Sequence, residues 1–184
     1  MHVSYCFCPE IPLLDLKTRV SVLVHAKELK RTTNTGRLAT LALANSGLHV
    51  RGLKDHALDI SQILDDGYEP LLFFPASDAV DLTKDYVSNF SKPIQLIVPD
   101  GNWRQASKVH TRHPELANVR RVKISAPNTA KHFLRKETTP EGMATLQAIA
   151  EALGIIDGQA VRDQLMVLYD LKLERTLRAR GVKL

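Results

Sequence analysis

The stretch Pro93-Ile-Gln-Leu-Ile-Val-Pro99-Asp100-Gly-Asn-Trp103 joins a short apolar run to a polar turn. A continuous apolar run of this length, bounded by proline, is typical of a strand that is buried on both faces of a sheet. The Asp-Gly pair favours a sharp turn, and the residues that follow predict a helix over 102–111. A buried strand that leads through a tight turn into a helix is the building unit of parallel α/β sheets.

Similar units occur on both sides of this stretch. Ser21-Val-Leu-Val-His25 and Pro70-Leu-Leu-Phe-Phe-Pro75 are further apolar runs that predict buried strands, and a fourth strand is expected over 119–124. Helices are expected over 35–44, where Asn45-Ser46-Gly47 ends the pattern, and over 77–83, 140–153 and 158–178. Strands that alternate with helices predict an α/β fold with a mostly parallel sheet and helices on both faces. Ligands of such sheets bind beyond the carboxyl ends of the strands.

Length and composition are those of one globular domain. The chain has 184 residues, of which 44% are hydrophobic, and no repeat or linker divides it. We therefore predict a single domain over 1–184, with a short N-terminal segment over 1–18. The longest stretch without Asp, Glu, Lys or Arg is 38–50, which is shorter than the roughly twenty residues that a membrane helix needs. We expect a cytoplasmic monomer that does not enter the membrane.

Only two cysteines are present, and they form the pattern Cys6-Phe-Cys8 in the N-terminal segment. This pattern resembles half of a zinc knuckle. A structural zinc normally takes four ligands, and two thiolates supply half of them. We therefore expect two reduced thiols and no zinc, which also favours a reducing compartment.

Basic residues are concentrated in the middle of the chain. The formal net charge is +5, yet residues 55–85 carry eight acids and one lysine, whereas residues 104–136 carry nine Lys or Arg and the single acid Glu115. Clustered cations are the electrostatic footprint of nucleic-acid binding, because each neutralised phosphate releases counterions. A second basic group near the C-terminus has two interpretations, a nucleic-acid face or favourable charge at a helix end. Its members are Lys172, Arg175, Arg178 and Arg180.

Three polar constellations follow the predicted strands. The run from His25 to Arg37 is rich in donors and precedes a helix, which suits a carboxylate or phosphate at the helix N-terminus, although Asn34 or Thr35 capping the helix explains it equally well. Asp100-Gly-Asn-Trp103 forms either a compact polar and aromatic site or an ordinary turn. Arg135-Lys136, ahead of Thr145-Leu146-Gln147-Ala148, offers cations and a hydroxyl to an anion, or is simply a charged loop.

Taken together and in this order, these segments resemble the DTW-domain family, the tRNA-uridine aminocarboxypropyltransferases. The resemblance covers roughly residues 6–153. At two positions the chain departs from the family pattern: Asn102 stands where the family has threonine, and Gln147 stands where it usually has glutamate. The residues that carry the resemblance are His25 with Glu28, Asn34-Thr35, Leu38, Leu72-Phe-Phe-Pro75, Asp100-Gly-Asn-Trp103-Arg-Gln-Ala106, Arg135-Lys136 and Thr145-Leu-Gln-Ala148.

The resemblance implies a fold related to the SPOUT-type methyltransferases, with a C-terminal trefoil knot. It also implies a reaction in which the 3-amino-3-carboxypropyl group of S-adenosylmethionine moves to N3 of a uridine in tRNA and methylthioadenosine is released. S-adenosylmethionine would then be a co-substrate and tRNA the partner. The residues alone predict only the α/β sheet, and two other activities stay open: an RNA methyltransferase of the SPOUT type and a non-catalytic RNA-binding module.

Site residues follow from this chemistry. N3 of uridine is a poor nucleophile until it loses its proton, and Asp100 is the candidate general base. Trp103 is the second candidate catalytic residue, because its ring would stack on a base or attract the sulfonium. Arg135 would hold the methionine carboxylate, and the cofactor pocket would be completed by Phe74, Pro75 and Thr145. The residues expected to bind RNA are His25, Lys30, Arg31, Arg104, Lys108, Arg120, Arg121 and Lys131.

Overall fold

A parallel sheet forms the centre of the molecule. The computed structural model describes residues 5–125, 134 and 142–182, and within these residues the sheet has six strands in the order β2-β1-β5-β3-β6-β4. All strand pairs are parallel. The predicted α/β class is therefore confirmed. The strands are β1 (Arg19–His25), β2 (Ser46–Arg51), β3 (Glu69–Phe73), β4 (Val80–Asp81), β5 (Ile94–Asp100) and β6 (Arg120–Lys123).

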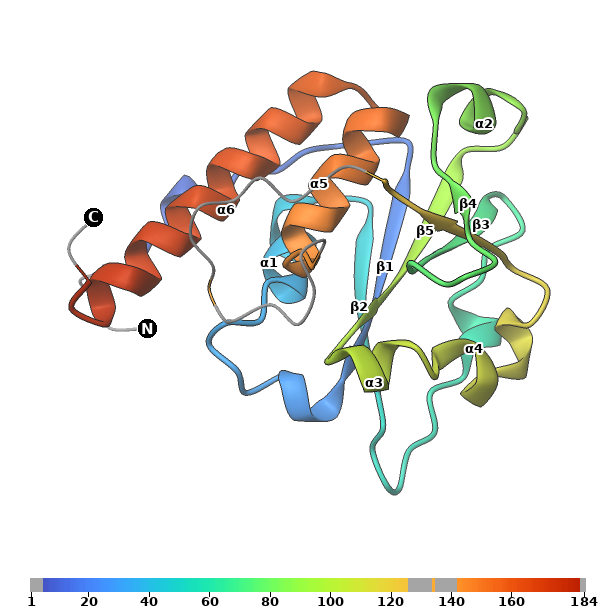
Figure 1. The fold of residues 1–184 in the computed structure, drawn as a ribbon, viewed down its shortest axis with the longest axis horizontal. Helices are drawn as coiled ribbons and strands as arrows, with labels where there is room; N and C mark the ends of the chain where they lie inside the picture. Colours follow the sequence, from blue (N-terminus) through green and yellow to red (C-terminus); the bar gives the residue numbers. More distant parts are fainter. Residues whose placement is uncertain (1–4, 126–133, 135–141, 183–184) are drawn as a thin grey trace.

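Two layers of helices and turns cover the sheet (Figure 1). The long helices lie on one face, with α5 packed between the sheet and α6, and shorter elements cover the other face. The helices are α1 (Gly36–Ala42), α2 (Lys84–Ser88), α3 (Trp103–Ala106), α4 (Val109–Arg112), α5 (Thr145–Ile156) and α6 (Gln159–Ala179). Short 3-10 turns are η2 (Cys8–Glu10), η3 (Ala26–Glu28), η4 (Ile60–Gln62) and η5 (Pro114–Leu116).

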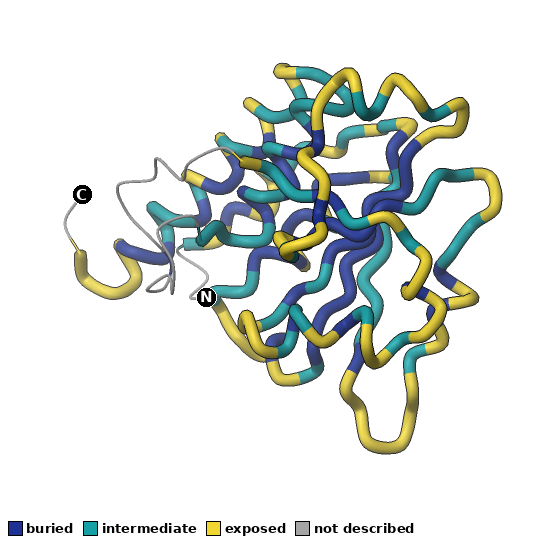
Figure 2. Tube along the Cα trace, turned by 45° about the vertical axis from the view of Figure 1, so that its right-hand side comes forward, coloured by how far each residue is buried: buried dark blue, intermediate teal, exposed yellow. Residues whose placement is uncertain are grey.

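The alternation of side chains along the strands divides the core into two parts. Figure 2 shows the central strands as the most deeply buried part of the molecule. Val22 and Leu96 face the large cluster with α1, α5 and α6, whereas Leu23 and Ile97 face a smaller cluster with η4 and α4. Because successive residues of a strand point to opposite faces, Asp100 lies on the α1 and α5 face and His25 on the other.

The neighbouring strands β1 and β5 form a topological switch point, because the connections that follow them lead to opposite sides of the sheet. The connection after β1 leads outward to β2, whereas β5 is followed by β6 on its other side, beyond β3. In α/β sheets the crevice between the carboxyl ends of such strands is the usual ligand site. His25 and Asp100 are the last residues of these two strands.

Several predicted elements differ in the structure. Residues 77–83 do not form a helix: Val80 and Asp81 pair with β6 as a short strand, and the helix begins only at Lys84. The helix expected over 102–111 is interrupted at Lys108, whose backbone (φ −93°, ψ 3°) leaves the helical range, so that α3 and α4 are separate. Strand β2 was not predicted, because Asn45-Ser46-Gly47 has the composition of a turn.

The predicted trefoil knot depends on the path of the chain between β6 and α5, where residues 126–133 and 135–141 lie outside the described part. Among the described residues, no helix is both long enough and apolar enough to cross a bilayer.

Candidate functional site

The carboxylate of Asp100 joins three segments at the carboxyl edge of the sheet. Asp100 ends β5 and is 2% exposed. Its Oδ2 accepts a hydrogen bond from Asn34 Nδ2 at 2.5 Å, and its Oδ1 accepts one from Thr145 Oγ1 at 2.6 Å. Asn34 lies just before α1, and Thr145 is the first residue of α5. One buried carboxylate therefore links β5 to the N-terminal ends of two helices.

The segment before α1 is itself held in place. Thr35 Oγ1 accepts a hydrogen bond from the backbone N–H of Leu146 at 3.1 Å, and Asn34 Oδ1 accepts one from the backbone N–H of Arg37 at 3.1 Å. Gly36 follows directly, and a Cβ at this position would stand 2.7 Å from Asp100 Oδ2. The orientation of the carboxylate is thus fixed by hydrogen bonds and by close packing, as a preorganised site requires.

An aromatic pair includes Trp103 of the loop that follows Asp100. Trp103 begins α3, three residues after Asp100, and its ring packs on Phe74 with centroids 5.0 Å apart and planes at 43°. Phe74 is buried, whereas Trp103 is 51% exposed. A large aromatic ring that is supported from one side and open on the other can stack on a base or attract a cation.

Asn102 takes the role of the helix cap in this loop. Its Oδ1 accepts a hydrogen bond from the backbone N–H of Gln105, and Gln105 Oε1 accepts one from the backbone N–H of Asn102, both at 2.9 Å. This reciprocal capping box fixes the start of α3. Threonine is also a good N-cap residue, so the departure from the family pattern at this position preserves the geometry of the loop.

The opposite face of the same edge carries a group of cations. Arg51 ends β2 directly beside His25 and is 2% exposed. Its Nε donates to the carbonyl of Leu23 at 3.2 Å, and its Nη2 donates to the carbonyl of Gln105 at 3.0 Å. Burial and the charge of Arg112 lower the pKa of Arg51, whereas the charge of Asp100 acts in the opposite direction.

Two histidines belong to this group. Burial lowers the pKa of His25 below its usual range, and the charges of Arg51 and of other nearby cations add to the effect. The pKa of His113, the residue after α4, is lowered mainly by burial and further by Arg51 and Arg112, although Glu115 opposes this. The charge pattern of residues 104–136 included Arg112 and His113, but Arg51 was missed because it lies on the unpredicted strand β2.

The predicted RNA-binding residues fall into two groups. Lys30, Arg104 and Lys108 are exposed, as an RNA contact requires, and Arg31 is exposed but pairs with Glu28 at 3.3 Å. His25 is buried, and its Nδ1 accepts a hydrogen bond from the backbone N–H of Lys27. Its contact with RNA stays a prediction.

Two predicted RNA contacts are occupied by ion pairs. Arg120 pairs with Glu69 at 2.9 Å, and Arg121 pairs with Asp78. Arg120 also begins β6, so it lies toward the amino ends of the strands and away from Asp100. The RNA contacts of both residues stay predictions, and an arginine that is already paired with a carboxylate is less available to a phosphate.

The structure describes two of the four remaining predicted site residues. Thr145 donates to Asp100 and is thus a support of the carboxylate, and Pro75 is exposed next to the aromatic pair. Arg135 and Lys131 lie outside the described residues.

The C-terminal basic group does not form a free cationic face. Lys172 is buried, and burial lowers its pKa. Arg175 pairs with Glu10 at 3.5 Å, Arg178 pairs with Glu174 at 2.7 Å, and Arg180 donates to the carbonyl of Leu134 at 3.0 Å. These contacts favour a structural role for the group.

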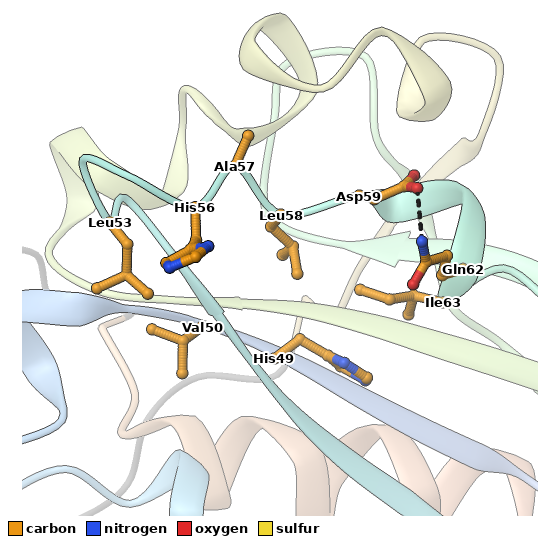
Figure 3. A pocket seen from close by; sticks show the side chains of 9 residues that line it. All are labelled: His49, Val50, Leu53, His56, Ala57, Leu58, Asp59, Gln62 and Ile63. Atoms are coloured by element: carbon orange, nitrogen blue, oxygen red, sulfur yellow. Dashed lines mark hydrogen bonds between the residues drawn. The ribbon is translucent and has the colours of Figure 1, made fainter.

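Two pockets lie away from Asp100. A cavity of about 410 Å³ lies between β2 and the segment that leads to η4, where His49 and His56 face Leu58 and Ile63 (Figure 3). Gln62 closes one end and donates to Asp59 at 2.9 Å. A second cavity, of about 520 Å³, lies at the amino ends of the strands around Tyr68 and Asp157. Neither cavity is lined by Asp100, Phe74 or Trp103.

The cysteines lie on the surface. Cys6 and Cys8 are both exposed and unbridged, with the Sγ atoms 3.2 Å apart. In residues 5–125, 134 and 142–182, no group of three or more His, Cys, Asp or Glu side chains could hold a metal. The prediction of no zinc stays untested, because His2, which could add a ligand to the two thiolates, lies outside these residues.

Three histidines should make the free energy of unfolding depend on pH. The pKa values of His25, His49 and His113 are all lowered from 6.5, chiefly by burial. Because the unfolded chain then binds protons more readily than the folded one, the free energy of unfolding should be highest above pH 6.5 and fall as the pH drops below it. Thermal unfolding between pH 7.5 and 5.5 measures this. His25→Asn, which keeps an acceptor for the Lys27 N–H, should flatten the dependence; an unchanged dependence would contradict the assignment.

Comparisons with known proteins agree with the sequence pattern. The family model described as the DTW domain matches residues 1–177. The "tRNA-uridine aminocarboxypropyltransferase 2" of Drosophila melanogaster is 28% identical over 173 residues, which cover 90% of this chain and 67% of that protein. The protein of the same name from Mus musculus is 22% identical over 158 residues, 83% of this chain and 53% of that protein. The chain thus spans between about half and two thirds of these relatives.

One solved structure is also similar in outline. It is described as the SAM-dependent rRNA:acp-transferase Tsr3 from Vulcanisaeta distributa, and it matches with a TM-score of 0.49 and 17% identity over 94% of this chain and 91% of that chain.

Proposed function

This chain belongs to the DTW-domain family, and from that premise we propose that it transfers the 3-amino-3-carboxypropyl group of S-adenosylmethionine to N3 of a uridine in tRNA. The observation that carries the proposal is the buried carboxylate of Asp100, which is fixed by two donors and precedes the half-exposed Trp103 by three residues. The names of the fly and mouse relatives support the same reaction and the same RNA substrate.

The reaction requires a base and strict orientation. A bond forms between uridine N3 and the γ-carbon of the methionine portion, and the bond between that carbon and sulfur breaks. The electron pair goes to sulfur, which leaves as the neutral thioether of methylthioadenosine, and the N3 proton must be removed. The sulfonium carries three carbons that can each be attacked, so the product depends on which carbon faces N3.

The residues of the site fit these requirements. Each carboxylate oxygen of Asp100 accepts one hydrogen bond within the protein, and each has a further lone pair for a proton donor. Asp100 is therefore assigned as the general base that takes the N3 proton. Trp103 presents its open ring to the uracil, the adenine or the sulfonium, with Phe74 supporting it from behind.

Product analysis tests the reaction directly. The protein is incubated with S-adenosylmethionine and unmodified tRNA, and both the tRNA nucleosides and the small-molecule product are analysed by mass spectrometry. We expect an aminocarboxypropyl uridine and methylthioadenosine. A methylated nucleoside with S-adenosylhomocysteine would establish the methyltransferase alternative, and tRNA binding with neither product would establish the non-catalytic RNA-binding module.

The oligomeric state, the localisation and the knot are also part of this proposal. We propose a monomeric, cytoplasmic protein that does not enter a membrane, on the basis of its composition and cysteine content. We also propose that the chain forms the trefoil knot of SPOUT-type proteins, which the family resemblance and the parallel sheet support.

The exposed cations next to the site should bind the RNA backbone, whereas the paired arginines should not. Arg104→Gln with Lys108→Gln is expected to reduce the slope of log K against log salt for tRNA by about one unit for each phosphate that the variant no longer neutralises. The matched double variant Arg120→Gln with Arg121→Gln removes the same charge and should leave the slope almost unchanged. Filter binding of tRNA at several salt concentrations measures both, and equal slopes for the two double variants would contradict the assignment.

A further inference from the structure

Arg51 is a buried cation whose hydrogen-bond partners are neutral. Its two hydrogen bonds go to the backbone carbonyls of Leu23 and Gln105. None of the ion pairs among the described residues includes Arg51. Asp100 is the acid whose charge reaches it, but the hydrogen bonds of Asp100 among the described residues come from Asn34 and Thr145 and not from Arg51. Burying a guanidinium without a carboxylate partner is costly unless a ligand supplies the negative charge.

The groups around Arg51 add positive charge and hydrogen-bond donors. Arg112 is exposed at the end of α4 and directly precedes His113 in the chain, and its charge lowers the pKa of Arg51, His25 and His113. His25 accepts at Nδ1 from the Lys27 N–H, so its neutral ring carries the proton on Nε2 as a donor. Like charges that are gathered in one place repel one another, and an anion that binds between them relieves this repulsion.

The position of this cluster relates it to the catalytic loop. Arg51 donates to the carbonyl of Gln105 in α3, and Arg51 Nη2 lies 3.5 Å from where a Cβ on Gly101 would stand. Gly101 separates Asp100 from the capped start of α3, which carries Trp103. A nucleotide whose base reaches Trp103 therefore brings its own phosphates to the same loop.

We propose that Arg51 and Arg112, with His25 and His113, form an oxyanion site that binds a phosphodiester of the RNA substrate next to the target uridine. The proposal rests on the proposed function for the identity of the RNA. A guanidinium binds the oxygens of a phosphodiester or of a carboxylate with the same geometry, so the methionine carboxylate of S-adenosylmethionine is the competing source of the oxyanion. The exposure of Arg112 and Lys27 favours the phosphodiester, because an anion that repeats along a chain is bound at the surface.

The test compares two affinities in one variant. Arg112→Gln removes the exposed cation of the cluster and leaves the buried hydrogen bonds of Arg51 intact. We expect its affinity for tRNA to fall about tenfold and its salt slope to decrease by about one unit. Its affinity for S-adenosylmethionine, measured by calorimetry, should not change. Lys84→Gln, an exposed cation on the distant helix α2, is the matched control and should behave as the wild type does.

A second measurement locates the phosphate. RNA oligonucleotides with a single neutral methylphosphonate linkage, placed on either side of the uridine, should bind more weakly to the wild type at one of the two positions. The variant Arg112→Gln should bind the oligonucleotide that is neutral at that position as tightly as it binds the unmodified oligonucleotide. Weaker binding of S-adenosylmethionine with an unchanged salt slope would assign the cluster to the carboxylate and overturn the proposal, and so would no change in either affinity.

These measurements separate the inference from the proposed function. Both are equilibrium binding experiments and need no turnover. A protein that forms no aminocarboxypropyl uridine but shows the expected change in salt slope would retain the phosphate site and lose the proposed activity. A protein that forms the product while the salt slope and the affinity of Arg112→Gln stay unchanged would keep the activity and lose the phosphate site.

Discussion

Replacing Asp100 with asparagine is expected to lower the rate of aminocarboxypropyl transfer by about 10²- to 10⁴-fold, the usual contribution of a positioned general base. Asparagine has nearly the shape of aspartate but cannot take the N3 proton. Its amide oxygen can still accept from Asn34, and its amide nitrogen can donate to Thr145, whose hydroxyl then accepts. The three segments therefore stay joined, and the variant should bind S-adenosylmethionine and tRNA as the wild type does.

A control in the same loop makes this result specific. Asn102→Thr restores the residue that is usual in the family and keeps a side-chain acceptor at the cap of α3. We expect transfer by this variant to stay close to that of the wild type. Single-turnover rates at saturating S-adenosylmethionine measure both variants. If Asp100→Asn transfers at the wild-type rate, Asp100 only holds the site together and another group removes the proton.

The parts of the fold that local sequence determines were predictable. Ser21-Val-Leu-Val-His25 and Ile94 to Val98 are apolar runs with no alternative to burial, and both are strands of the central sheet. Parallel strands present their carboxyl ends at one edge of a sheet, and at this edge Asp100 accepts hydrogen bonds from Asn34 and Thr145.

The remaining parts depend on contacts between distant segments. Among the strands of the described residues, β2 pairs with β1 alone. Most of its residues are partly exposed, so its sequence shows neither an apolar run nor a clear alternation. Missing β2 removed Arg51 from the candidate site, although Arg51 lies beside His25 in the sheet. Burial of His25 and the ion pairs of Arg120 and Arg121 likewise follow from the packing of segments that composition cannot relate to one another.

The close packing around Gly36 leads to the second large effect that we expect. Gly36 is the first residue of α1. In the middle of a helix, alanine is more stable than glycine by about 0.5–1 kcal/mol. Here the added Cβ would stand 2.7 Å from Asp100 Oδ2 and 3.1 Å from Val22 Cγ1. Gly36→Ala should therefore destabilise the protein by about 1–3 kcal/mol, as overpacking of a core does. It should also displace the carboxylate and abolish most of the transfer activity.

A double-mutant cycle separates the clash with Asp100 from a general intolerance of α1. Asp100→Ser shortens the side chain that the added methyl group would meet, so Gly36→Ala should cost much less in that background than in the wild type. Urea unfolding of the four proteins gives the coupling free energy, and single-turnover transfer by Gly36→Ala gives its effect on chemistry. If the cost of Gly36→Ala is equal in both backgrounds, the clash lies with Val22, and any decrease in activity is an indirect effect of instability. A large coupling together with abolished transfer would show that the position of one carboxylate, set by a glycine on a neighbouring helix, limits the reaction.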